Sequence, residues 1–262
     1  MNFFKTNKGF TLHYHWIDNR KPRTFLFINS LGTDFRIWDA VVDVLREEGN
    51  ILLFDKRGHG LSDLNPNTNG LSDYMEDVIE LLGHLSIAKC IPIGLSIGGM
   101  IAQLLAYHYP HLIDRLVLCD TRAKIADEAF WNNRIQQVQQ SGLKELSIGI
   151  LQRWFPESFH RNNPDQISGC RNMLERCPPE GYVLACAAIR DADLTAKSRQ
   201  INVPVLCIVG SEDLSTLPAE VKELSALIPG AKYKEIKGSG HIPCVDNPVE
   251  LNRLIIEFIN AV

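Results

Sequence analysis

Short, continuous apolar runs recur along the chain and alternate with stretches of helical periodicity. A strand that is buried on both faces of a parallel sheet reads as such a run, so each run predicts one strand. Segment 11–16 alternates loosely instead and predicts an antiparallel strand near the start of the chain. The alternation of strands with helices indicates an α/β fold with a mostly parallel sheet. The strands predicted after residue 20 span 25–28, 51–54, 91–93, 116–119, 205–209 and 233–236.

Two helices are predicted within the first 110 residues. Residues 72–85 place their apolar side chains on one stripe, and Ser72 is the expected N-cap of this helix. A second, strongly apolar helix follows residue 96. We expect it to stop at Pro110, because the residue before a proline disfavours helical geometry.

The strand signal disappears between residues 122 and 200, where amphipathic helical stretches take its place. We therefore expect an α/β core of residues 1–121 and 201–262, interrupted by a helical cap of residues 122–200 over the active site. The cap has 11 Lys+Arg against 9 Asp+Glu, and the core has 16 against 22. A cap that is more basic than its core favours an anionic substrate, although charges paired along the helices explain the balance equally well. The predicted cap helices span 127–140, 143–154, 165–176 and 180–191.

Composition and charge argue against several functional classes. A net charge of −4 without a basic run is not typical of a nucleic-acid-binding protein. No apolar stretch approaches the length of a membrane span, and the first residues do not have the pattern of a secretory signal. The seven cysteines include no C-x-x-C pair and are expected to be reduced thiols. The sequence therefore predicts a cytoplasmic protein with no membrane or nucleic-acid partner, and it leaves the oligomeric state open.

A serine flanked by glycines follows the predicted strand at 91–93. Residues 94–98 read Gly-Leu-Ser-Ile-Gly, and a helix begins directly after Ser96. A serine on such a strand-to-helix corner is the nucleophile elbow of α/β hydrolases, and the start of the helix points free N–H groups at it. We expect Ser96 to be a nucleophile. An ordinary glycine-rich turn is the alternative, and Pro92 inside the strand counts against the assignment.

A serine nucleophile needs a base, and the base needs an acid that orients it. In α/β hydrolases these residues follow in the order serine, acid, histidine. Asp213 comes three residues after the glycine that ends the strand at 205–209, and it is the expected acid. Glu212 beside it and Asp120, at the end of the strand at 116–119, are the alternatives.

The expected base is His241, because it lies in a glycine-rich loop just past the last predicted strand. His59 also follows a strand and could reach the same edge of the sheet, but bracing its own turn is the simpler role. For the oxyanion hole, the residue after the nucleophile, Ile97, supplies one backbone N–H. The loop after the strand at 25–28 supplies the other, and because Asn29-Ser30 replaces the His-Gly of many relatives, Leu31 is the expected donor.

The chain resembles the α/β-hydrolase superfamily over its whole length, and within it the 3-oxoadipate enol-lactonases. The resemblance rests on the serine string, on Asn29-Ser30-Leu31-Gly32-Thr33-Asp34, and on cap strings at 131–135 and 181–194. It implies a mostly parallel sheet of eight strands flanked by helices, and a Ser-His-Asp triad. It further implies that a small anionic lactone, 3-oxoadipate enol-lactone, is hydrolysed to 3-oxoadipate through an acyl-enzyme in aromatic catabolism, with no cofactor and no metal.

Two arginines and two tryptophans of the predicted cap are candidates for substrate binding. Arg134 and Arg190 stand in the strings that resemble the enol-lactonases, and a planar guanidinium pairs well with the acetate arm of the lactone. Trp131 and Trp154 are candidates for an apolar wall of the pocket. Salt bridges within the cap for the arginines and core packing for the tryptophans are the alternatives.

Other functions are compatible with the same scaffold. A general carboxylesterase, a cofactor-free perhydrolase or a carbon–carbon hydrolase would use the same nucleophile and differ in the cap. A small-molecule receptor with an intact triad is an alternative from a different class of protein. Its turnover would lie far below the roughly 1–10 per second expected of a metabolic enzyme.

Overall fold

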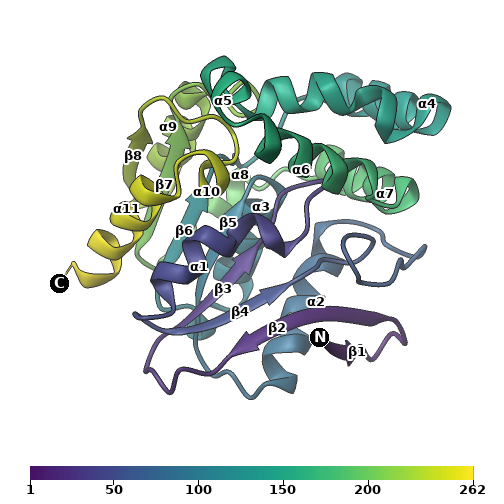
Figure 1. The fold of residues 1–262 in the computed structure, drawn as a ribbon. Coiled ribbons are helices and arrows are strands. Elements are labelled where there is room, and N and C mark those ends of the chain that lie inside the picture. Colours follow the sequence, from purple (N-terminus) through teal and green to yellow (C-terminus); the bar gives the residue numbers. More distant parts are fainter. Residues whose placement is uncertain (262) are drawn as a thin grey trace.

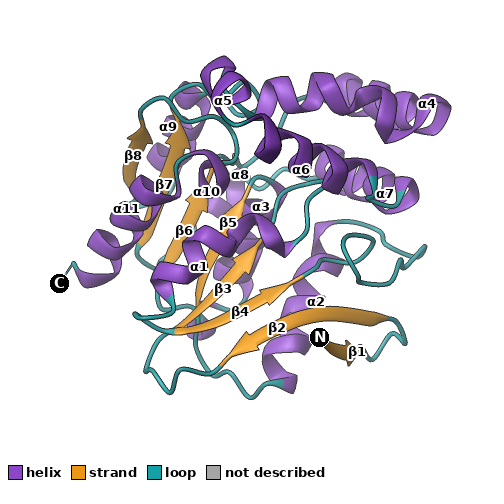
Figure 2. Ribbon diagram, in the orientation of Figure 1, coloured by secondary structure: helices purple, strands orange, loops and turns teal. Residues whose placement is uncertain are grey.

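The computed structural model describes residues 1–261, in which eight strands form one sheet with helices on both faces (Figures 1 and 2). The strand order is β1-β2-β4-β3-β5-β6-β7-β8. β2 runs antiparallel to both of its neighbours, and all other neighbouring strands are parallel. The expected α/β fold is confirmed. The strands are β1 Asn2–Lys5, β2 Thr11–Ile17, β3 Thr24–Ile28, β4 Asn50–Phe54, β5 Ile91–Leu95, β6 Leu116–Cys119, β7 Val205–Gly210 and β8 Lys232–Ile236.

The continuous apolar runs form the centre of the sheet. Strands β3 to β7 are buried at every position, which is why their sequences do not alternate. Phe27 pairs in register with Leu53 on one side and Ile93 on the other. Since these strands are parallel, their carboxyl ends meet at one edge of the sheet. The loops that follow β3, β5, β6 and β7 therefore start close together, which is where α/β folds place their ligand sites.

Helices cover both faces of the sheet. On one face α1 packs against α11, and on the other α2 packs against α3 (Figure 2). α3 ends at His108, just before Pro110, as the sequence predicts. The elements of the two faces are η1 Phe35–Trp38, α1 Asp39–Leu45, α2 Leu71–His84, α3 Ile97–His108, η2 Pro110–Leu112, α9 Pro218–Leu227, α10 Pro243–Asp246 and α11 Pro248–Asn260.

The regular elements described between β6 and β7 are all helices, joined by loops, and they lie beyond the carboxyl ends of the parallel strands (Figure 1). Its longest helix, α4, packs against α6 and α7. Gly142 has non-helical dihedral angles (φ 72°, ψ 172°) and divides α4 into two parts, which correspond to the stretches predicted at 127–140 and 143–154. The helices are α4 Glu128–Trp154, α5 Glu157–Asn162, α6 Pro164–Glu175, α7 Pro179–Arg190 and α8 Thr195–Ser198.

The structure corrects the sequence-based expectations in three places. β1 was not expected, because it is a short and mostly exposed edge strand without an apolar run. The N-cap of α2 is Gly70 rather than Ser72, because the helix already begins at Leu71. The short helices α5 and α8 were also not expected. Pro92 does lie within β5, but pairing with β6 starts only at Ile93, so the missing N–H interrupts little of the ladder. Among residues 1–261, no helix combines the length and the apolar character needed to cross a bilayer.

Candidate active site

Ser96 occupies the corner between β5 and α3 with a backbone that non-glycine residues rarely adopt (φ 58°, ψ −118°). Its N–H donates to the carbonyl of Cys119, and the carbonyl of Ser96 accepts the hydroxyl of Thr121 at 2.7 Å. The flanking glycines make this corner possible. A Cβ at Gly94 would lie 2.4 Å from the carbonyl oxygen of Gly98, and one at Gly98 would lie 2.0 Å from that of Ile28. The geometry is that of the elbow expected from the sequence.

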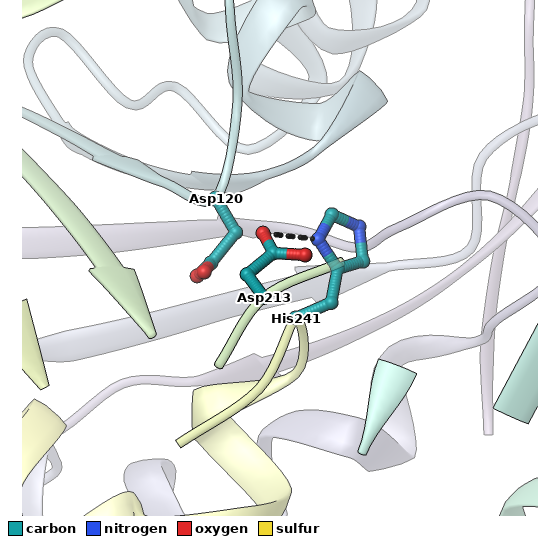
Figure 3. Close-up of side chains that lie close together, drawn as sticks. All are labelled: Asp120, Asp213 and His241. Atoms are coloured by element: carbon teal, nitrogen blue, oxygen red, sulfur yellow. Dashed lines mark hydrogen bonds and ion pairs between the residues drawn. The ribbon is translucent and has the colours of Figure 1, made fainter. Parts of the chain in front are cut away.

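Asp213 and His241 lie on two neighbouring loops and are hydrogen-bonded to each other (Figure 3). His241 Nδ1 is 2.8 Å from Asp213 Oδ2, and both side chains are buried. Asp213 also accepts the N–H groups of Ser215 and Thr216 and the hydroxyl of Thr216. Burial alone would raise the pKa of the Asp213 carboxyl, but the facing His241 ring and these donors outweigh burial and hold the pKa below its ordinary value. Asp213 therefore carries a negative charge against the ring.

The backbone fixes the loop that carries His241. The N–H of His241 donates to the carbonyl of Trp154, the last residue of α4, at 2.7 Å. In the same loop, the carboxylate of Asp246 accepts the hydroxyl of Ser239 and, at 2.6 Å, the N–H of Gly240. The orientation of the imidazole therefore depends on both α4 and α10. Asp246 was missed by the sequence analysis, because nothing in its local pattern marks it as a brace.

Asp120, one of the alternative acids, is fully buried behind Asp213, and Figure 3 shows Asp213 between its carboxyl group and the ring of His241. Its Oδ1 accepts the N–H of Gly210 at 2.9 Å, and its Oδ2 has no partner within residues 1–261. Burial and then the charge of Asp213 raise the pKa of Asp120 well above its usual range, which favours the protonated form of Asp120. Glu212, the other alternative, is exposed, and His59 is buried in its own turn.

Asp120, Asp213 and His241 also offer one possible metal-ligand atom each, all within 4.8 Å of one another. However, Asp213 Oδ2 and His241 Nδ1 already face each other across a short hydrogen bond. A metal ion between these atoms would have to break that bond and displace the donors to Asp213. The donor set therefore suits proton handling better than metal binding, and we assign no metal to it.

The two expected oxyanion donors lie at the same edge of the sheet. Leu31 follows β3, and Ile97 is the first residue of α3. Neither N–H finds a hydrogen-bond acceptor within the described part of the chain, residues 1–261. Thr33 holds the first loop in place, because its Oγ1 donates to the carbonyl of Ser30 at 2.9 Å and its carbonyl accepts the side-chain amide of Asn29. These two bonds fix the backbone of the loop in which Asn29-Ser30 stands.

A cavity of about 390 Å³ opens where these loops meet the helices after β6. Ser96 and His241 line it together with Ser30 and Leu31, so nucleophile and base candidates face one space. On the helical side, Trp131 and Trp154 line it as expected. Both tryptophans are largely buried, so they act as wall and as core at once.

Three arginines line the cavity, and they differ in their partners. Arg122 forms an ion pair with Glu220 at 2.7 Å. Arg134 instead donates to the hydroxyl of Tyr182 at 3.1 Å and lies 5.5 Å from the centre of the Phe130 ring. Arg153, which the sequence analysis missed, lies 5.8 Å from the same ring. Among residues 1–261, neither Arg134 nor Arg153 pairs with a carboxylate, so both positive charges remain available to a ligand.

The structure does not bring Arg190 to this cavity, contrary to expectation. Its Nε and Nη2 donate to the carboxylate of Asp191 at 2.7 and 2.9 Å, and its Nη1 donates to Asn132. All three donor positions are thus used on the surface of the helices.

Comparison with known proteins gives the class of this site. A model of the alpha/beta hydrolase fold family matches residues 23–248. The 3-oxoadipate enol-lactonase 1 of Acinetobacter baylyi is 31% identical, with 96% of this chain and 98% of the relative covered. The 3-oxoadipate enol-lactonase 2 of the same organism is 29% identical over 95% and 93%. The chain therefore belongs to the α/β-hydrolase family.

Solved structures agree with this classification. The enol-lactonase from Burkholderia xenovorans has a TM-score of 0.96 and 30% identity, and 99% of this chain and 100% of that chain are covered. A thermophilic esterase from Thermogutta terrifontis with malate bound has a TM-score of 0.92 and 26% identity, over 99% and 98%. The resemblance to enol-lactonases is thus confirmed along the whole chain. The protein is an enzyme, a hydrolase of the carboxylic ester class.

Proposed function

We propose that the protein hydrolyses the ring ester of 3-oxoadipate enol-lactone, with Ser96, His241 and Asp213 as the catalytic triad. The observation that carries this proposal is a single cavity lined by Ser96, His241 and two arginines that lack carboxylate partners within residues 1–261. Enol-lactonases that match nearly the whole chain at about 30% identity support the choice of substrate.

In the first half of the reaction, Ser96 Oγ attacks the lactone carbonyl while His241 Nε2 takes the hydroxyl proton. The hydrogen bond from Nδ1 to Asp213 keeps Nε2 free for this role and stabilises the imidazolium. The N–H groups of Leu31 and Ile97 bind the oxyanion of the tetrahedral intermediate. When the intermediate collapses, the ring C–O bond breaks and its electron pair stays on the enol oxygen, which receives the proton from His241.

In the second half, His241 deprotonates a water molecule, which attacks the acyl-enzyme. The Ser96 Oγ–acyl bond breaks, the serine takes the proton back, and the open-chain carboxylic acid leaves. The enol tautomerises to the ketone, which gives 3-oxoadipate. Each step uses only this chain's side chains, backbone amides and water.

The carboxylate arm of the substrate binds to Arg134 and Arg153 in this proposal. Both arginines belong to α4, within the helical segment that follows β6. We propose that residues 122–200 act as a cap over a core of residues 1–121 and 201–262, and that the cap selects the substrate. The cysteines are free and mostly buried, which supports action of the enzyme in the reducing cytoplasm.

The lactone assay of the purified protein tests this function, with Ser96→Ala as the catalytic control. We expect Ser96→Ala to lose at least about a thousandfold in kcat, because only binding and the oxyanion hole remain. Arg134→Ala and Arg153→Ala should each raise KM for the lactone by about tenfold to a hundredfold, since a hydrogen bond to a charged group contributes about 1.5–3 kcal/mol. With p-nitrophenyl acetate, which has no anionic arm, both variants should stay near the wild-type KM.

Arg190→Ala is the matched control, because it removes a guanidinium from the same helical segment but outside the cavity. It should leave KM unchanged for both substrates. A wild-type enzyme that turns over p-nitrophenyl acetate but not the lactone would reject the proposed substrate. Equal effects of Arg134→Ala on both substrates would reject the anion-binding role.

A carboxylesterase acting on uncharged esters is the second candidate. Leu214 and Leu217 line the cavity and are 55% and 46% exposed, so they form an apolar rim at its entrance. The Thermogutta terrifontis esterase covers 99% of this chain with a TM-score of 0.92. A panel of p-nitrophenyl esters of increasing acyl length, compared with the lactone in kcat/KM, distinguishes the two functions.

A further inference from the structure

Lys56 is completely buried, although it carries an amine that is normally exposed. It lies in the turn after β4, and no carboxylate pairs with it in the part of the chain the structure describes. An unpaired ammonium in a protein interior is costly, and an apolar side chain of similar shape would avoid this cost. A buried amine without an ion-pair partner therefore indicates a functional role for Lys56.

Within residues 1–261, the one hydrogen bond of the amine leads to the oxyanion loop. Nζ of Lys56 donates to the carbonyl oxygen of Ser30 at 2.5 Å. This carbonyl belongs to the Ser30–Leu31 peptide, whose N–H is the Leu31 donor of the proposed oxyanion hole. Because a trans peptide points its C=O and N–H in opposite directions, the ammonium and an oxyanion would sit at the two ends of one peptide group.

We propose that Lys56 is a positioning residue that fixes and polarises the Ser30–Leu31 peptide, so that the Leu31 N–H becomes a stronger donor to the oxyanion. This inference rests on the oxyanion role given to Leu31 under the proposed function. A positive charge on the acceptor side withdraws electron density through the peptide, and hydrogen bonds in such a chain strengthen one another. Lys56 itself does not touch the substrate.

Two carboxylates act on this charge through space, but neither forms an ion pair with it among residues 1–261. The acidic groups nearest to Lys56 are Asp55 and Asp34, which are engaged with His13 and Arg36. Cys177 and His59 also face it, and burial keeps both neutral near pH 7. Burial lowers the pKa of Lys56 to about 7, so the ammonium is present below neutral pH and gives way to the amine above it. The effect on the peptide should fade over the same range.

The test compares wild type with Lys56→Met, an unbranched side chain that is one heavy atom shorter and has no charge, on p-nitrophenyl acetate from pH 6 to pH 9. At pH 6 we expect kcat to fall about tenfold with KM unchanged, a fraction of the roughly hundredfold or larger loss that follows removal of an oxyanion donor. The ratio of the two kcat values should shrink towards about twofold at pH 9. Thr33→Val, which removes the uncharged donor to the same carbonyl, should cost only about twofold to threefold and show no such pH dependence.

A kcat ratio below twofold at pH 6, or one that does not change with pH, overturns the proposal. A merely structural lysine would change the thermal midpoint and affect kcat equally at all pH values. If Lys56→Met does not fold by circular dichroism, Lys56→Gln is compared in the same way, since it retains a donor without the charge. The ester does not depend on the identity of the lactone, so this result and the lactone assay can fail independently.

Discussion

Gly181 and Gly58 bring the helical segment and the core into backbone contact. Gly181 lies in the first turn of α7, and Gly58 lies in the turn after β4. A Cβ at position 181 would be 2.2 Å from the carbonyl oxygen of Gly58 and 2.7 Å from its Cα. Ordinary contacts start near 3.4 Å. Because both obstacles are backbone atoms, no rotamer relieves them, and Gly181→Ala must push α7 away from the core by about 1 Å.

This displacement reaches the cavity directly. Tyr182, the next residue, lines the cavity and accepts the hydrogen bond from Arg134. A misplacement of 1 Å in a positioning group reduces catalysis by about a hundredfold. Overpacking also costs about 1–3 kcal/mol of stability. We therefore expect Gly181→Ala to lower kcat/KM for the lactone by one to two orders of magnitude and to lower the Tm by several degrees.

Gly169→Ala is the matched control, since Gly169 also lies within a helix of the same segment, and a Cβ there meets nothing within 4 Å. It should retain full activity and gain about 0.5–1 kcal/mol from the better helix propensity of alanine. Steady-state kinetics and thermal unfolding of both variants supply the measurement. A Gly181→Ala enzyme within threefold of wild type in kcat/KM, with an unchanged Tm, would refute the argument.

Two further predictions concern the buried carboxylates. Asp213→Asn should reduce kcat by about three to four orders of magnitude. Asp120→Asn mimics the protonated form that the raised pKa of Asp120 favours, so it should stay within about threefold of wild type. The reverse order of the two effects would make Asp120 the acid. Burial raises the pKa of Asp246 to about 6. The folded state therefore binds the proton of this carboxyl group more tightly than the unfolded state does. As a result, the contribution of Asp246 to the free energy of unfolding decreases as the pH rises from about 4 to about 6. The free energy of unfolding of wild type, relative to Asp246→Asn, should fall by roughly 3 kcal/mol over that range in urea titrations, and a constant difference would contradict the pKa shift.

The centre of the fold could be predicted because burial on both faces leaves a direct trace in the sequence. Runs such as 25–28 and 51–54 cannot alternate when every position is covered, and each became a central strand. β1 leaves no such trace. Three of its four residues are exposed, and it is held by pairing with β2, which lies beyond the reach of local pattern.

The candidate site was predictable where chemistry depends on local geometry. Gly94 and Gly98 reveal the corner at Ser96, because backbone of α3 at the first and of the end of β3 at the second leaves no room for a Cβ. The side of the cavity that is proposed to bind the anion was less accessible to sequence reasoning. In an unbroken helix, Arg134 and Arg153 would stand about 28 Å apart along the axis. The break at Gly142 turns the chain back, and both guanidiniums end within 6 Å of the Phe130 ring.

The choice between Asp120 and Asp213 shows what spacing alone cannot decide. Two buried carboxyl groups this close cannot both ionise, so the protein must assign one charge between them. The hydrogen-bond donors make that assignment. Asp213 receives two backbone N–H groups, a hydroxyl and the imidazole, whereas Asp120 receives one N–H. The charge therefore resides on the carboxyl group that faces His241, and a neutral Asp120 behind it removes a competing anion from the ring.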